Sequence, residues 1–208
     1  QNLIINEFVF KDFEKIIFLN QGGLFFTLLS IYFLFNFLNF ADGINGVAIS
    51  LCIFWSIIFL VKSNELNYFM LSMIISLAFV LFFNIKNKIF LGNNGSSVLS
   101  IIFGSYFVYT YNIEGQIKCD EIFLLMFIPG IDSIRVSLQR IYKQQSPFKG
   151  DKIHLHHLLL KFINMKYIFL IYITISAIPF MLTYIMSTVF SLIISFALYF
   201  TLFFITNK

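Results

Sequence analysis

Seven long apolar segments constrain this chain more than any other feature. They are continuously apolar and do not alternate, and they run near residues 22–40, 47–62, 68–84, 96–112, 121–141, 168–187 and 189–206. Each approaches the roughly 17–25 residues that a helix needs to cross a bilayer, whereas barrel strands would alternate in character. We therefore expect an all-α fold, a polytopic transmembrane helix bundle with about seven spans that forms a single domain over residues 1–208.

The composition excludes a soluble globular domain. Of the 208 residues, 59% are hydrophobic and only 12% are charged, and no soluble domain of this size can bury so much apolar surface. The apolar segments are also too numerous for one signal peptide ahead of a soluble body. We expect the lipid bilayer to surround this chain and expect no nucleic acid partner.

The loop charges predict which end of the bundle faces the cytoplasm. If alternate loops share a side, one side carries ten basic and three acidic residues, and the other carries four basic and seven acidic residues. The net charges are +7 and −3, so the positive-inside rule places the first side in the cytoplasm. The expected cytoplasmic loops lie near residues 41–46, 85–96 and 142–167. Residues 1–20 are expected on the outer side as a short polar hairpin or surface segment.

Two further features bear on the context of the chain. Cys52 lies within an expected span and Cys119 in an expected outer loop, so a disulfide between them is not predicted. The chain begins with Gln1 and has no basic segment ahead of its first span. We interpret it as the C-terminal part of a longer protein.

Three polar clusters fall on the predicted cytoplasmic side. The first, Asn36–Gly46, contains Asp42 at the end of an apolar run. A carboxylate and several carboxamides at a membrane boundary cost free energy, which indicates a binding or catalytic site. A capped helix end with a glycine stop is the alternative. The second cluster spans Asn84–Ser97, and the third spans Asp132–Lys166.

The second cluster has the chemistry of an anion site. Gly92, Gly95, Ser96 and Ser97 stand where a helix is expected to start, and the free N–H groups of such a helix end attract phosphate oxygens. A plain turn with a helix cap fits these residues equally well. Phe90 precedes the glycines, and its flat ring is suited to stacking on a base.

The third cluster combines basic and imidazole side chains. Arg135 and Arg140 could bind phosphate through the two parallel N–H groups of the guanidinium. Lys143, Lys149 and Lys152 could bind it as point charges. There are alternatives for these basic residues. They could orient the chain in the membrane or contact anionic lipid, and Arg135 could form an ion pair with Asp132, three positions earlier.

All three histidines of the chain, His154, His156 and His157, fall within four positions. A zinc site would need ligands beyond Asp151. Contact with a pyrophosphate or a proton relay fits the basic surroundings better, and a purely structural trio remains an alternative.

These three clusters resemble motifs of the polyprenyl-phosphate N-acetylhexosamine-1-phosphate transferases (glycosyltransferase family 4). The family pattern Asn-x-x-Asn-x-x-Asp-Gly-x-[Asn/Asp]-Gly matches from Asn36 to Gly46. The pattern Phe-[Leu/Met]-Gly-Asp-x-Gly-Ser matches from Phe90 to Ser96, with Asn93 in place of the aspartate. The pattern Asp-Ser-x-Arg-Val…Ser-Pro-Phe…His-x-His-His-Leu matches from Asp132 to Leu158 and favours the N-acetylhexosamine branch.

The resemblance implies a reaction. A phosphate oxygen of undecaprenyl phosphate attacks the β-phosphorus of a UDP-N-acetylhexosamine such as UDP-GlcNAc, giving a lipid diphosphate sugar and UMP and initiating cell-surface polysaccharide synthesis. Mg²⁺, or Mn²⁺ in its place, assists. The implied location is the bacterial inner membrane with the active site facing the cytoplasm, and a homodimer is an open expectation. The sequence does not identify the sugar.

The resemblance also implies residue roles. The catalytic residues would be Asp42, His154, His156 and His157, with Asp42 near metal and phosphates. The nucleotide, pyrophosphate or sugar would be bound by Asn36, Asn39, Asn45, Asn84, Phe90, Gly95, Ser96, Arg135 and Arg140. The metal would be held at Asn93 and Asp42.

Two departures from the family pattern matter. The carboxamide of Asn93 is a weaker ligand for a hard cation than the usual aspartate, and the family's adjacent aspartates do not occur in this chain. We therefore expect the chain alone to be inactive. A membrane transporter, or a family member that binds nucleotide sugar or lipid without turnover, is the alternative function.

Overall fold

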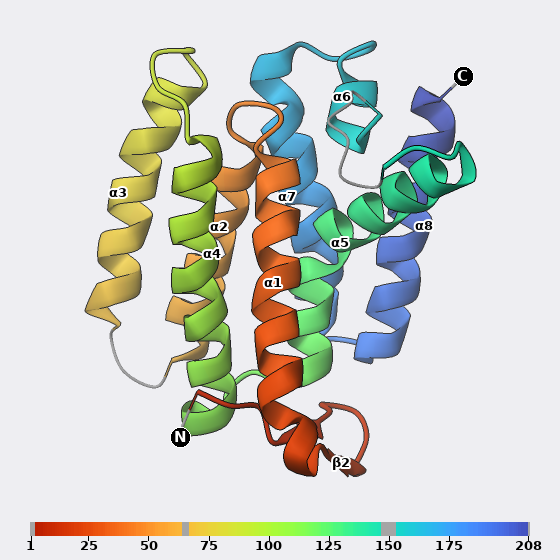
Figure 1. The fold of residues 1–208 in the computed structure, drawn as a ribbon. Coiled ribbons are helices and arrows are strands. Elements are labelled where there is room, and N and C mark those ends of the chain that lie inside the picture. Colours follow the sequence, from red (N-terminus) through yellow and green to blue (C-terminus); the bar gives the residue numbers. More distant parts are fainter. Residues whose placement is uncertain (1–2, 64–66, 147–152, 208) are drawn as a thin grey trace.

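The computed structural model describes residues 3–63, 67–146 and 153–207, and every long element in them is a helix (Figure 1). The all-α prediction is thus confirmed. The helices are α1 (Gly23–Ala41), α2 (Val47–Lys62), α3 (Tyr68–Asn84), α4 (Gly92–Tyr109), α5 (Cys119–Tyr142), α6 (Leu155–Leu159), α7 (Met165–Leu182) and α8 (Thr188–Thr206). A 3-10 turn, η1 (Asn20–Gly22), leads into α1, and a π-helical segment, η2 (Thr110–Glu114), continues α4.

Each of the seven expected spans coincides with one long helix. Three of the described helical stretches, Asn20–Ala41, α7 and α8, are long and apolar enough to cross a membrane, and α2 and α3 are apolar but shorter. The protein is therefore a membrane protein in which the number of spans, about seven, remains a prediction.

Two expected spans are displaced along the chain, and one expected loop contains a short helix. The fourth helix begins at Gly92 and not near residue 96, so the glycines form its first turn. The next-to-last helix covers Met165–Leu182 and not 168–187, because the Asn164 side chain caps its start by accepting from the Lys166 N–H. Within the segment 142–167, the short helix α6 is present.

The two ends of the bundle differ in structure. Figure 1 shows the α1–α2 connection, the α3–α4 connection and α6 at one end, and the N-terminal segment at the other. That segment is an antiparallel hairpin of β1 (Glu7–Val9) and β2 (Ile16–Phe18). It is held to the helices because the Val9 N–H donates to the Tyr111 hydroxyl at 2.7 Å and the Ile5 N–H to Thr27 Oγ1 at 2.8 Å.

Helix α2 forms the centre of the bundle and α5 is bent. Most residues of α2 are buried, and its Trp55 donates to the Leu125 carbonyl of α5 at 3.3 Å. Pro129 lies inside α5, where its missing N–H and its ring disfavour a straight helix. Figure 1 shows the second half of α5 turned toward α8 beneath α6, so residues 132–140 lie next to the histidine segment.

Candidate functional site

The first two polar clusters meet at the start of α4. The N–H of Gly92 donates to Asp42 Oδ2 at 3.0 Å, and the Ser96 hydroxyl donates to Asn39 Oδ1 at 3.3 Å. The first N–H groups of a helix lack intrahelical partners and carry partial positive charge. The Asp42 carboxylate therefore lies at the positive end of α4.

The histidines lie against the same loop. A Cβ atom at Gly43 would come within 2.7 Å of His156 Nε2 and 3.2 Å of His157 Nε2, so glycine permits this approach. The ring of His154 stacks on Phe40, with 5.1 Å between centroids, and lies parallel to the ring of His156 at 5.4 Å. Three segments that are far apart in the sequence thus lie together at one end of the bundle.

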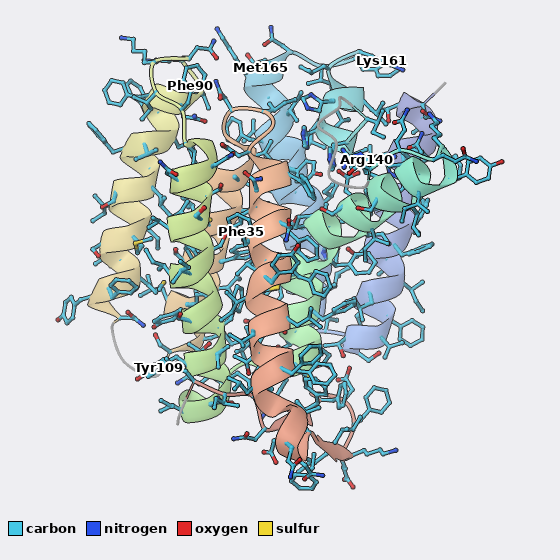
Figure 2. All side chains as sticks on the ribbon, in the orientation of Figure 1. Phe35, Phe90, Tyr109, Arg140, Lys161 and Met165 are labelled. Carbon is cyan, nitrogen blue, oxygen red and sulfur yellow. The ribbon has the colours of Figure 1, made fainter. Side chains whose placement is uncertain are left out.

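Figure 2 locates this end by labelled side chains. Phe90, Lys161 and Met165 lie at the end that carries the clusters, and Tyr109 lies toward the opposite end. Phe90 is 74% exposed at the α3–α4 connection, where its ring faces outward. The family-like segment also contains Pro147, Phe148, Lys149, Asp151 and Lys152, which lie outside the described residues.

Carboxamides join the α1–α2 loop to the end of α3. Asn84 is fully buried, its Oδ1 accepts from the Gly46 N–H at 2.6 Å, and its Nδ2 donates to the Ile89 carbonyl at 2.9 Å. Asn45 donates to Asn87 Oδ1 at 2.7 Å. These bonds give Asn84 a role in holding the loop. A cavity of about 110 Å³ adjoins them, lined by Asn45, Ile85, Asn87, Asn164, Met165 and Lys166.

Asp132 is the centre of a buried polar network. Its Oδ1 accepts from Arg135 Nη2 at 2.8 Å and from the Tyr199 hydroxyl at 2.7 Å, and its Oδ2 lies 2.9 Å from His154 Nδ1. The Leu155 N–H also donates to this carboxylate. Neither Asp132 nor Tyr199 was predicted as a site residue. Asp132 was named in the third cluster, in the family-like motif and as an ion-pair partner, but no role in the site was assigned to it. A lone tyrosine in an apolar span gives no signal.

The two predicted arginines lie inside the protein. Arg135 donates to Asp132, Tyr199, Gln139 and the Ile153 carbonyl, so the ion pair left open by the sequence is present. Arg140 is 1% exposed, with its guanidinium 5.9 Å from the Phe40 ring. A residue that first contacts an incoming phosphate would have its guanidinium exposed to solvent, and neither of these guanidinium groups is.

Two of the predicted binding residues, Asn36 and Gly95, make their contacts within the chain close to their own positions. Asn36 donates to the Tyr32 carbonyl one turn earlier in α1. Gly95 lies in the first turn of α4, where a Cβ would come within 2.6 Å of the Leu91 side chain. The structure therefore places Asp42, Asn39, Ser96 and the histidines together, and leaves Asn36 facing its own helix.

Burial shifts the protonation of two groups at the meeting point. It raises the pKa of Asp42 to about 6, against the lowering effect of the Gly92 hydrogen bond, and it lowers the pKa of His156 to about 3. Both ring nitrogens of His156 and the Nε2 of His154 are buried without a hydrogen-bond partner among the described residues. Such atoms are costly to leave unpaired, which is typical of a place where a ligand docks.

The described residues do not by themselves fit a magnesium ion. Among residues 3–63, 67–146 and 153–207, no group of three or more His, Cys, Asp or Glu side chains is placed to hold a metal. Asp42 supplies one carboxylate, and Asn93 supplies a carboxamide where a hard cation prefers charged oxygen ligands.

Two apolar cavities lie along the side of the bundle. A cavity of about 340 Å³ lies between α1 and α5 and shares Ser30, Phe123 and Met126 with a second one of about 220 Å³ near the hairpin. At its other side it shares Phe37 with a small cleft lined by Phe37, Phe40, Ala41, Pro129, Asp132, Ser133, His156 and Tyr172.

Comparison with known proteins identifies relatives of this chain. The model of the family described as glycosyl transferase family 4 matches residues 3–111. An undecaprenyl-phosphate alpha-N-acetylglucosaminyl 1-phosphate transferase of Escherichia coli K12 is 24% identical over 167 residues, 74% of this chain and 44% of that protein. The protein of the same name from Pasteurella multocida is 29% identical over 115 residues, 50% of this chain and 32% of that protein.

A decaprenyl-phosphate N-acetylglucosaminephosphotransferase of Mycolicibacterium smegmatis is 24% identical over 182 residues, 74% of this chain and 45% of that protein. The chain thus spans less than half the length of these curated relatives. No solved structure gives a significant match.

Proposed function

This chain belongs to glycosyl transferase family 4, and we propose that it is part of an enzyme that transfers N-acetylhexosamine 1-phosphate from a UDP-sugar to undecaprenyl phosphate. The names of its bacterial relatives support a polyprenyl-phosphate acceptor and an N-acetylglucosamine 1-phosphate group. The proposal adds the UDP donor, the release of UMP and a site at the cytoplasmic face.

The observation that carries the proposal is the meeting of the three clusters. Gly92 donates to Asp42, and Gly43 lies against His156. In the proposed reaction, an oxygen of the lipid phosphate forms a bond to the β-phosphorus, the bond from that phosphorus to the bridging oxygen breaks, and UMP leaves with that oxygen. Transfer between two anions depends mainly on alignment and on fixed positive groups.

Residues of this chain supply part of that alignment. The amide end of α4 offers partial positive charge to a diphosphate. The ring nitrogens of His156, which have no hydrogen-bond partner among the described residues, offer hydrogen-bonding positions beside it. Asn45 and the cavity next to it are suited to a base, since carboxamides match the donor and acceptor edge of uracil. Phe90 would stack there after moving inward from its exposed position.

The acceptor lipid has a matching surface. An apolar cavity of about 340 Å³ lies between α1 and α5, and one of its lining residues, Phe37, also lines the small cleft that includes Asp132 and His156. An isoprenoid chain could pack against these apolar side chains from within the bilayer. A water-soluble nucleotide sugar and a membrane lipid could thus meet at one boundary.

A direct assay tests the proposal. Full-length protein in detergent or nanodiscs is supplied with undecaprenyl phosphate and UDP-GlcNAc, UDP-GalNAc or a 6-deoxy relative, with and without Mg²⁺, and UMP is measured. We expect UMP release with at least one sugar, and loss of release in Asp42→Asn. Absence of UMP with every sugar would contradict the transferase. Binding of UDP-sugar without UMP would then favour the non-catalytic alternative suggested by Asn93.

A further inference from the structure

The network around Asp132 connects the last helix to the histidines. The Tyr199 hydroxyl of α8 accepts a hydrogen bond from Arg135 Nε at 2.7 Å and donates to Asp132 Oδ1 at 2.7 Å. Asp132 Oδ2 in turn lies 2.9 Å from His154 Nδ1. Tyr199 is fully buried and Asp132 is 2% exposed, so bulk water does not compete for these bonds.

The donors in this network fix its proton positions. An ionised carboxylate only accepts hydrogen bonds, and Asp132 is paired with Arg135. The Nδ1 of His154 must therefore carry the proton that is donated to Asp132, and in neutral imidazole the Nε2 is then a lone-pair acceptor. That Nε2 is buried and has no partner in the described part of the chain.

We propose that Tyr199 and Arg135 are positioning residues that hold His154, through Asp132, in the Nδ1–H tautomer. The ring of His154 stacks with both Phe40 and His156, so fixing it also restricts the His156 ring that lies against Gly43. An unprotonated Nε2 repels an ionised phosphate oxygen and accepts from a hydroxyl or an amide N–H. His154 is therefore assigned to the sugar group and not to the diphosphate, an assignment that rests on the proposed function.

If the network served only to pack α8 against α5, the effect of changing Tyr199 would be different. Tyr199 would then be important for stability and irrelevant to the proton on His154. The tautomer of His154 is thus the property that separates positioning from packing, and it can be measured without any substrate.

The experiment uses full-length protein labelled with ¹⁵N-histidine in nanodiscs at pH 8. The ¹⁵N shifts of the two ring nitrogens report the tautomer, and the signal that disappears in His154→Gln assigns them. Tyr199→Phe removes one hydroxyl from the network. Ser195→Ala is the matched control, because Ser195 is buried one turn earlier on α8 and its hydroxyl has no partner in the described residues.

We expect the Nδ1–H tautomer in the wild type and in Ser195→Ala. In Tyr199→Phe, Asp132 loses a bond that holds its carboxylate toward His154, so that the carboxylate can turn away from Nδ1 and a mixture of tautomers is expected. UMP release by Tyr199→Phe should lose about tenfold in kcat with a smaller change in KM, as for one lost hydrogen bond to a charged group. If Tyr199→Phe does not fold, Arg135→Lys tests the same network, because lysine retains the charge but loses the Nε donation to Tyr199.

Two results would overturn the proposal: a wild-type His154 protonated at Nε2, or an unchanged tautomer in the folded variant. A wild type that shows the Nδ1–H tautomer but releases no UMP would leave the positioning network standing and overturn the transferase instead.

Discussion

At residue 43, the chain has no room for a side chain. A Cβ there would lie 2.7 Å from His156 Nε2 and 3.3 Å from the Phe40 carbonyl, so Gly43→Ala must move the buried His156 ring. We expect UMP release to fall on the order of 100-fold, since about 1 Å of misplacement costs that much in an aligned site.

Gly22→Ala is the control for that substitution. Gly22 lies at the hairpin end, and the nearest atom to its Cβ would be a Phe26 ring carbon at 3.8 Å. Its activity should stay within twofold of the wild type. If Gly43→Ala and Gly22→Ala lost activity equally, the loss would come from replacing a glycine by alanine and not from the contact with His156.

The ionisation of Asp42 predicts an acidic limb in the activity. Its pKa is raised from 3.8 to about 6 by burial, so the carboxylate is mostly ionised at pH 7 and mostly protonated at pH 5. If the ionised form serves the reaction, UMP release should fall about tenfold for each pH unit below about 6. The rate is measured from pH 5 to 8 at saturating substrates, and a rate independent of pH over this range would remove Asp42 from the chemistry.

Polar residues that are clustered in the sequence also lie near one another in the structure, and their roles stay predictions. Asp42, Asn39, Ser96 and His156 were expected in one site, and the structure places them together. Tyr199 could not be found in this way, because it lies 67 positions from Asp132 in an apolar helix where tyrosines are ordinary. The role of Arg135 stayed open because its spacing from Asp132 suits both an ion pair and a phosphate contact.

At the level of elements, the Tyr111 hydroxyl is one of several groups that attach the N-terminal hairpin to the bundle. Tyr111 accepts from the Val9 N–H at 2.7 Å and donates to the Glu7 carbonyl at 2.8 Å. Tyr111→Phe should lower the free energy of unfolding by about 1–3 kcal/mol, because it leaves a part-buried N–H unpaired. UMP release per folded molecule should be unchanged, since the hairpin lies at the other end of the bundle.

Thermal unfolding in detergent measures this effect, with Tyr109→Phe as the control. The Tyr109 hydroxyl makes no hydrogen bond to the described residues, and the side chain is 37% exposed. A loss of stability no larger in Tyr111→Phe than in Tyr109→Phe would argue against the attachment.

The helices were predictable from the sequence because continuous apolar segments of this length form helices in membranes. The residues at which these helices begin and end were less predictable. The short helix α6 has only five residues, which is too few for a periodic pattern. The expected loop near residues 85–96 included Gly92 and Gly95, which belong to the first turn of α4. The bend of α5 at Pro129 determines where Asp132 and Arg135 lie, and its direction depends on packing against α8 that no local pattern encodes.

At the scale of the whole molecule, the two ends of the bundle should face opposite sides of the membrane. Phe90 is 74% exposed at the site end and Phe18 is 65% exposed on the hairpin. In a background with Cys119→Ser, we expect an impermeant maleimide to label Phe18→Cys in intact cells and to label Phe90→Cys only after permeabilisation. Native Cys52 is fully buried and should not react. The reverse pattern would place the site outside the cytoplasm.

The central claim is that the α1–α2 loop, the start of α4 and the histidine segment together hold a diphosphate. The most direct measurement is a cryo-EM map of the full-length protein with UDP-GlcNAc bound. We predict diphosphate density between the Gly92 end of α4 and His156, with the sugar beside His154. Nucleotide density at the hairpin end, or away from all three segments, would contradict the account.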